Sequence, residues 1–218
     1  SVKNALAQIQ SGDRVFVHGG AATPNFLLHH LVLESFRLQN VELIHMHTEG
    51  PAEYANPIYK NSFKVVNLFV GANMRANINY EDNDYLPCFL SEMPSLFRKG
   101  IRPPRVALIQ VSPPDSHGYC SLGTSVDIAK AAVDTAEIVI AQVNQYMPRV
   151  FGDGVLHVRE IDFFVEGHEA LPELHEKNDN KSKVAEKLIA QLVATLVDEG
   201  ATLQMGIGSV PDAVLAAL

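Results

Sequence analysis

Short apolar segments rich in β-branched residues alternate along this chain with longer segments of helical periodicity. Two of the apolar segments, 106–109 (Val-Ala-Leu-Ile) and 138–141 (Ile-Val-Ile-Ala), contain no polar residue. Strands that are apolar on both faces are typical of a parallel sheet covered by helices on both sides. The alternation therefore predicts an α/β fold in which helices cover a mostly parallel sheet.

Seven segments have the composition of strands, namely 14–18, 41–47, 63–70, 105–111, 137–143, 161–165 and 201–205. Six segments have helical periodicity, namely 2–10, 24–38, 91–99, 125–133, 181–199 and 211–218. Pro24 and Pro211 each stand where the first residue of a helix is expected. At that position the missing N–H of proline costs little.

The 218 residues correspond to between one and two domains, at roughly 150 residues per domain. The polar stretch 173–181 is the best candidate for a linker, because it contains few apolar residues. After it come a predicted helix, a predicted strand, a glycine turn and an apolar helix without a polar stop. We therefore expect a first α/β domain over residues 1–175. Residues 176–218 are expected to form a linker helix and the beginning of a second α/β domain, truncated from a longer protein.

The chain is acidic, with 17 basic and 25 acidic residues and a formal net charge of −8. This excess of negative charge argues against binding to nucleic acid or to an anionic membrane. No apolar run approaches the roughly 20 residues of a membrane span, and the first residues lack the pattern of a signal peptide. Cys88 and Cys120 indicate neither a disulfide framework nor a zinc site. We expect a cytoplasmic protein in a reducing compartment.

Glycines, prolines and polar residues follow the predicted strands, in the loops 18–24, 47–51, 71–73, 112–119, 144–148 and 206–209. In open α/β sheets, ligands bind outside the carboxyl ends of the strands. We therefore expect these loops to form one cleft that is lined mostly by backbone.

Gly206 and Gly208 follow the last predicted strand and precede a helix. Glycines at such a turn let main-chain N–H groups approach a phosphate or a developing oxyanion, because no Cβ is in the way. Gly19 and Gly20, which precede Pro24, have a similar arrangement. The spacing fits neither a dinucleotide fingerprint nor a P-loop, so a tight turn needed only for packing is an equally good interpretation of each pair.

His45, His47 and Glu49 offer nitrogen and carboxylate ligands, and residues two apart on a strand face the same side. A metal site is nevertheless disfavoured, because no third or fourth ligand is apparent and the chain turns directly afterwards at residues 50–51. We therefore assign no metal ligand.

Ser112, Asp115 and His117 are the residue types of a hydrolytic triad, but they lie within a few residues of one another. Triads are assembled from distant positions, and the sequence Pro-Pro-Asp-Ser-His-Gly is typical of a turn. We predict a turn here, with His117 or Tyr119 available as a hydrogen-bond donor in a pocket.

Three segments together resemble the acetyl-CoA hydrolase and 4-hydroxybutyrate or butyrate CoA-transferase family: SPPDSHGYCSLGTSVD at 112–127, VNQYMPRVFGD at 143–153 and QMGIGSVPDAV at 204–214. The resemblance extends over nearly the whole chain. It implies a CoA-transferase-like fold of two similar three-layer α/β/α halves. This chain resembles the first half and the start of the second.

The resemblance implies transfer of coenzyme A between an acyl-CoA and a short-chain carboxylate. A glutamate would attack the thioester, a glutamyl-CoA thioester would form on the enzyme, and the acceptor carboxylate would then take the CoA. In the family this glutamate lies shortly after the segment that matches residues 206–212, so its position falls beyond Leu218. We therefore name no catalytic residue, since none of the candidate glutamates matches that position: Glu34, Glu42, Glu49, Glu53, Glu92 and Glu137. Coenzyme A is then a substrate, no permanently bound cofactor is implied, and the family habit of dimerisation implies a homodimer.

We expect the substrate site to include residues from the strand exits: Gln204, Gly206, Gly208, Gly19, Gly20, Pro24, Gly71, Asn73, His117 and Asn144. Those at 204–208 would supply N–H groups and a side-chain amide near the thioester or CoA. Those at 19–24 would shape the wall of the acyl pocket, and the others would line the interface between the two halves.

Other classes of function stay open. An acyl-CoA hydrolase would use the same intermediate with water as the acceptor, and nothing in the sequence decides whether water is excluded. A non-catalytic chain would bind CoA or dimerise without turnover. A sugar-phosphate isomerase of similar layered architecture is a more distant alternative that rests on fold analogy alone.

Overall fold

The computed structural model describes residues 1–75, 83–173, 180–206 and 208–218. It divides into two compact units, Ser1–Glu173 (unit 1) and Leu174–Leu218 (unit 2). The predicted domain boundary at 175–176 and most of the predicted linker lie outside the described residues.

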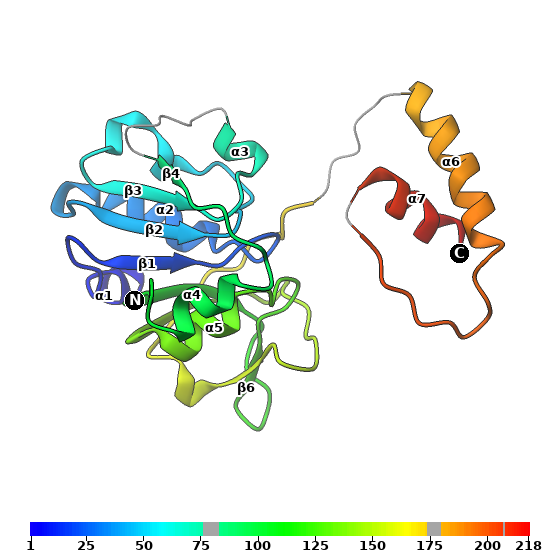
Figure 1. The fold of residues 1–218 in the computed structure, drawn as a ribbon. Helices are drawn as coiled ribbons and strands as arrows, with labels where there is room; N and C mark the ends of the chain where they lie inside the picture. Colours follow the sequence, from blue (N-terminus) through cyan, green and yellow to red (C-terminus); the bar gives the residue numbers. More distant parts are fainter. Residues whose placement is uncertain (76–82, 174–179, 207) are drawn as a thin grey trace. The chain divides into compact units, whose positions relative to one another are not determined.

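A seven-stranded sheet with the order β4-β3-β2-β1-β5-β7-β9 forms the centre of unit 1 (Figure 1). Its strands are β1 (Arg14–Val17), β2 (Val41–His45), β3 (Phe63–Asn67), β4 (Asn83–Tyr85), β5 (Val106–Val111), β7 (Ile138–Val143) and β9 (Phe163–Glu166). Every neighbouring pair in this sheet is parallel. A separate antiparallel pair is formed by β6 (Tyr119–Ser121) and β8 (Val155–His157). The prediction of an α/β fold with a mostly parallel sheet is confirmed.

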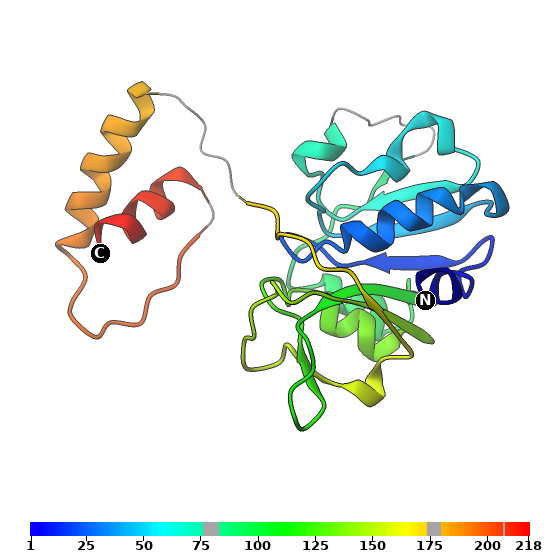
Figure 2. The same cartoon turned by 180° about the vertical axis from the view of Figure 1, so that it is seen from behind.

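Helices cover both faces of the sheet, which gives three layers (Figures 1 and 2). One face is covered by α1 (Val2–Leu6), α2 (Asn25–Leu33) and the 3-10 helix η2 (Glu53–Ala55), and the other by α4 (Met93–Arg98) and α5 (Ala129–Thr135). The short elements η1 (Ser35–Arg37), η3 (Pro57–Tyr59), α3 (Ala72–Arg75) and η4 (Val158–Glu160) lie in the connections.

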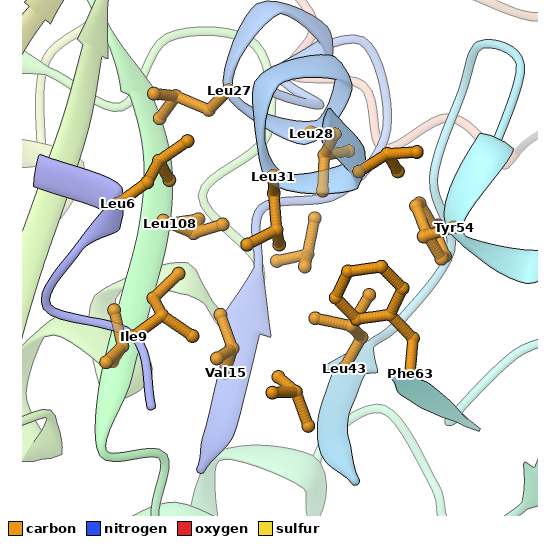
Figure 3. Packing of buried hydrophobic residues seen from close by; sticks show 14 of the residues in the cluster. Leu6, Ile9, Val15, Leu27, Leu28, Leu31, Leu43, Tyr54, Phe63 and Leu108 are labelled. Atoms are coloured by element: carbon orange, nitrogen blue, oxygen red, sulfur yellow. The ribbon is translucent and has the colours of Figure 1, made fainter. Parts of the chain in front are cut away.

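Two hydrophobic clusters, one on each face, form the core of unit 1. Leu43 of β2 belongs to the α2-side cluster and Ile44 to the α5-side cluster, because successive side chains of a strand point to opposite faces. Figure 3 shows Leu27 and Leu31 of α2 packed among strand residues such as Leu108. Burying a side chain of this size contributes roughly 1.5–3 kcal/mol, so the sheet is stabilised from both sides.

The helices of unit 1 are shorter than the sequence predicts. α2 ends at Leu33, where the chain turns into η1, and α5 begins at Ala129 rather than at 125. Asp127 determines the later start, since its carboxylate accepts hydrogen bonds from the N–H groups of Ile128 and Ala129. Pro24 is the residue before α2 rather than its first residue.

Unit 2 consists of α6 (Asn180–Ala194) and α7 (Ser209–Ala217), which pack against each other. Pro211 is the third residue of α7 rather than the first. The strand predicted at 201–205 is wrong, because residues 201–206 have no regular structure. A strand needs a neighbouring strand to accept its ladder hydrogen bonds, and the part of unit 2 that is described offers none. Among the described residues, none of the helices is long and apolar enough to cross a bilayer.

Candidate functional site

The parallel sheet places the carboxyl ends of its strands at one edge, called here the carboxyl edge. Gly19 and Gly20 follow β1, Gly71 and Asn73 follow β3, and Asn144 follows β7. The structure therefore brings these five predicted residues to the same edge of unit 1.

The loop after β2 lies between the two glycine segments. The Gly20 N–H donates to the His47 carbonyl at 3.0 Å, and Gly20 forms an isolated β-bridge with Thr48. A Cβ on Gly19 would lie only 2.6 Å from that carbonyl oxygen, whereas a Cβ on Gly71 would lie 3.0 Å from Asn73 Oδ1 and 3.5 Å from the Thr48 carbonyl oxygen. Gly19 thus has a structural reason to be glycine, because the exits of β1 and β2 approach too closely for a side chain.

Three amides of the first glycine loop, those of Gly20, Ala22 and Thr23, are bonded within the protein. The Ala22 N–H donates to the Gly19 carbonyl at 3.2 Å, and the Thr23 N–H donates to the Gly20 carbonyl at 3.1 Å. These groups are therefore not free to hold an anion, and side chains supply polar groups here instead. A Cβ on Gly20 would lie 2.8 Å from Ser125 Oγ and 3.9 Å from His47 Nε2, which locates both partly buried side chains at the carboxyl edge.

A buried hydrogen-bonded chain supports the β2 and β3 loops from beneath. Asn73 Nδ2 donates to Thr48 Oγ1 at 3.3 Å, and Thr48 Oγ1 lies 2.9 Å from the Tyr54 hydroxyl. The Tyr54 hydroxyl in turn lies 3.2 Å from His45 Nε2. Tyr54 comes from η2, so this short helix fixes Thr48 and through it Asn73.

Burial keeps the two innermost histidines neutral. Desolvation and, to a smaller extent, the positive charge that His47 can carry lower the pKa of His45 to about 4. Desolvation also lowers the pKa of His18, whose Nδ1 accepts from the Gln110 N–H at 3.2 Å while its Nε2 faces the Ser125 carbonyl. Desolvation raises the pKa of the Tyr54 hydroxyl.

Metal binding by His45, His47 and Glu49 finds no support in this geometry. His45 Nε2 is engaged by the Tyr54 hydroxyl. Across the part of the chain that the structure describes, no three His, Cys, Asp or Glu side chains are grouped as metal ligands would be.

Sequence reasoning missed a set of buried amides beneath the carboxyl edge. Gln110 of β5 and Gln142 of β7 are fully buried, and Gln110 Oε1 accepts from Gln142 Nε2 at 3.2 Å and from Asn144 Nδ2 at 2.8 Å. Gln142 Nε2 also donates to Glu169 Oε1 at 2.9 Å. The signal was present, since a single glutamine within an otherwise apolar strand must find buried partners.

Pro24 and His117 are the remaining predicted residues of unit 1. Pro24 precedes α2 on the β1 connection. His117 is exposed in the turn between β5 and β6, where its N–H donates to Asp115 Oδ1 at 2.9 Å. The predicted turn at this position is confirmed. The neighbouring Gly118 lies against His157, so this turn packs on β8.

Gln204, Gly206 and Gly208 belong to unit 2. Gln204 and Gly206 are exposed in the segment without regular structure, and Gly208 immediately precedes α7 with a φ of +138°. A non-glycine residue would be strained in that conformation. Ile207, between the two glycines, lies outside the described residues.

Comparison with known proteins gives consistent matches. A family model described as the acetyl-CoA hydrolase/transferase N-terminal domain matches residues 1–175. The succinyl-CoA:acetate/propanoyl-CoA:succinate CoA transferase of Fasciola hepatica is 42% identical over 96% of this chain and 44% of that protein. The 4-hydroxybutyrate coenzyme A transferase of Clostridium kluyveri is 41% identical over 99% of this chain and 49% of that protein. The chain thus spans about half the length of these curated relatives.

A solved structure gives the same result. The crystal structure of 4-hydroxybutyrate CoA-transferase from Porphyromonas gingivalis matches with a TM-score of 0.79 and 32% sequence identity, over 100% of this chain and 50% of that one. The CoA-transferase-like fold expected from the sequence is confirmed.

Proposed function

Because the chain belongs to the acetyl-CoA hydrolase/transferase family, we propose that it is the part of a CoA-transferase that forms one wall of the substrate site. The proposed reaction transfers coenzyme A between an acyl-CoA and a short-chain carboxylate. The observation that carries the proposal is the identity of 41–42% with two CoA transferases over nearly the whole chain. No permanently bound cofactor is proposed, since coenzyme A is a substrate of this reaction.

The proposed mechanism uses an enzyme glutamyl-CoA thioester, with the reactive glutamate outside this chain. The surroundings of three glutamates support this location. Glu42 is paired with Arg14 and Arg102, Glu34 lies 2.7 Å from Arg37, and Glu53 lies 3.2 Å from His29. A carboxylate that pairs with a cation or accepts a hydrogen bond is a weaker nucleophile than a free one, so none of these three suits the role.

The carboxyl edge of unit 1 is the proposed position of the acyl group and the acceptor. Gly19, Gly20 and Pro24 are proposed to shape the wall of the acyl pocket. Asn73, Asn144, Gly71 and His117 are proposed to line the interface with a second half, and Gln204, Gly206 and Gly208 to lie near the thioester. A homodimer in the cytoplasm is the proposed context.

The proposal is tested by measuring CoA transfer from butyryl-CoA to acetate. We expect turnover by a polypeptide extended to the length of the relatives and none by residues 1–218 alone. Turnover by the 218-residue chain would contradict the location of the glutamate, and absence of turnover by the extended protein would contradict the transferase proposal.

Hydrolysis is the second candidate, because the family description names hydrolases as well as transferases. The two activities differ in the acceptor, which is water in one case and a carboxylate in the other. A hydrolase releases free CoA at the same rate with and without acetate. A transferase requires acetate and forms acetyl-CoA. CoA binding by the extended protein without either activity would instead identify a non-catalytic binding protein.

A further inference from the structure

A chain of side-chain hydrogen bonds crosses the carboxyl edge from the exit of β9 to the exit of β1. Glu169 Oε1 accepts from Gln142 Nε2 at 2.9 Å, and Gln142 Nε2 also donates to Gln110 Oε1 at 3.2 Å. Gln110 Nε2 then donates to the Thr23 carbonyl at 3.2 Å. Gln142, Gln110 and Thr23 are at most 1% exposed, so water does not compete for the bonds that join these three residues, whereas Glu169 itself is partly exposed.

The first turn of α2 depends on the same groups. The Phe26 N–H donates to Glu169 Oε1 at 3.1 Å, and the Leu27 N–H lies 3.4 Å from Gln142 Oε1. The first N–H groups of a helix have no partner within the helix, and a negative charge near them is favourable. The Glu169 carboxylate therefore fixes where α2 begins.

Thr23, at the other end of the chain of bonds, joins two loops of the candidate site. Its hydroxyl donates to the Gly20 carbonyl at 2.7 Å and accepts from the Glu49 N–H at 3.0 Å. A shift of Thr23 would therefore move the loop after β1 and the loop after β2 together.

We infer that Glu169 is a positioning residue, which holds the Gly20–Thr23 loop and the start of α2 in place through Gln142 and Gln110. The effect of Glu169 on catalysis rests on the proposed function, whereas its effect on the Gly20–Thr23 loop and on the start of α2 does not. Without the carboxylate, the Phe26 N–H loses its acceptor, and Gln142 Nε2 keeps only the Gly167 carbonyl at 2.9 Å and Gln110 Oε1 at 3.2 Å. The Gln142 amide then readjusts toward these two oxygens and displaces Gln110, which holds the Thr23 carbonyl. The effect should therefore extend from β9 to Thr23.

The structural consequence is tested by amide hydrogen exchange in the 218-residue chain. In Glu169→Ala we expect exchange at Phe26, Ala22 and Thr23 to be faster by about tenfold, since exchange reports local opening. Glu166→Ala is the matched control, because Glu166 is exposed on β9 and makes no side-chain bond with any described residue. Faster exchange at Phe26 alone, with Ala22 and Thr23 unchanged, would overturn the inference.

The kinetic consequence is tested in the extended protein with butyryl-CoA and acetate. We expect Glu169→Ala to raise KM by about fivefold and to leave kcat within about twofold, because a displaced loop weakens ground-state and transition-state binding alike. Glu169→Gln should restore KM, since its amide oxygen can accept the same bonds. An unchanged KM in Glu169→Ala, or an equal defect in Glu169→Gln, would overturn the positioning role. Inactivity of the unsubstituted protein would instead refute the proposed function, and the exchange result would still decide the inference.

Discussion

Buried polar side chains under the carboxyl edge are the residues on which the loops of the candidate site depend. His45, Tyr54 and Thr48 form one hydrogen-bonded set, and Gln110 and Gln142 belong to another. A buried polar group costs free energy unless it is bonded, so each set permits only a few arrangements. The loops are thereby fixed from below, by side chains that a ligand would not touch.

One such residue should make stability depend on pH. The pKa of His45 is about 4 in the folded state, against an ordinary value of 6.5 in the unfolded chain. Below about pH 6.5 the unfolded state therefore takes up the proton first, and the free energy of unfolding falls as the pH drops toward 4. The stability that the neutral His45 contributes is retained above about pH 6.5. By pH 5 we expect the free energy of unfolding to have fallen by roughly 2 kcal/mol.

Urea unfolding of the 218-residue chain, followed by circular dichroism, checks this expectation. His45→Gln removes the titration and leaves an acceptor for Tyr54, so its stability should fall less than that of the unsubstituted chain between pH 7 and pH 5. His117→Gln is the control, because His117 is exposed. If the His45→Gln chain and the unsubstituted chain lost stability in parallel, burial of a neutral His45 would not be the cause.

At the scale of elements, the candidate site depends on how closely the strand exits approach one another. The β1 and β2 exits are joined by the bond from the Gly20 N–H to the His47 carbonyl. The β3 exit is joined to the β2 loop by Asn73, which donates to Thr48 and to the Gly50 carbonyl. Glycine at position 19 is what allows the first of these approaches.

Gly19→Ala is therefore expected to destabilise the chain by about 1–3 kcal/mol, a cost typical of overpacking. The new methyl group would meet the His47 carbonyl oxygen at 2.6 Å, and a backbone oxygen can yield only if the β2 loop shifts. Thermal unfolding measures the loss.

Gly12→Asn is the matched control for this substitution. Gly12 has a φ of +83° and nothing within 4 Å of its Cβ position, and asparagine tolerates positive φ. A Gly19→Ala chain as stable as the Gly12→Asn chain would show that the two exits can separate at no cost.

At the scale of the whole molecule, both hydrophobic clusters consist of residues from unit 1. We expect residues 1–173, expressed alone, to unfold cooperatively at a temperature within about 3 °C of the corresponding transition in the 218-residue chain, since no member of either cluster is removed. Calorimetry of the two chains makes the comparison. A transition lower by about 10 °C would show that unit 1 requires residues 174–218 for its stability.

Periodicity predicted most of this architecture. The apolar runs at 106–111 and 138–143 became β5 and β7, because a strand apolar on both faces has no stable place except inside a covered sheet. It failed at 201–205, where an apolar segment lacks a strand to pair with. It also missed β4, β6 and β8, since three-residue strands carry too few residues to show a period.

The candidate site was predicted only in part. Glycine after a strand identified the exits at 19–20 and 71, because chain reversal beside another backbone favours a residue without Cβ. The same reasoning could not find Gln110, Gln142 or Glu169, which are joined to Thr23 across intervals of many residues. Hydrogen-bond partners that are distant in sequence carry no local pattern.

The sequence by itself determined the layered sheet, the positions of the strand exits and the family, because these depend on local periodicity and on motifs that occupy neighbouring residues. Only the tertiary structure decided which groups at the carboxyl edge are already engaged. It pairs the amides of Gly20, Ala22 and Thr23 with carbonyl groups, and it joins Glu169 to Thr23 through two buried glutamines. The reason is physical, since a hydrogen bond depends on distance and direction in space, which folding alone establishes.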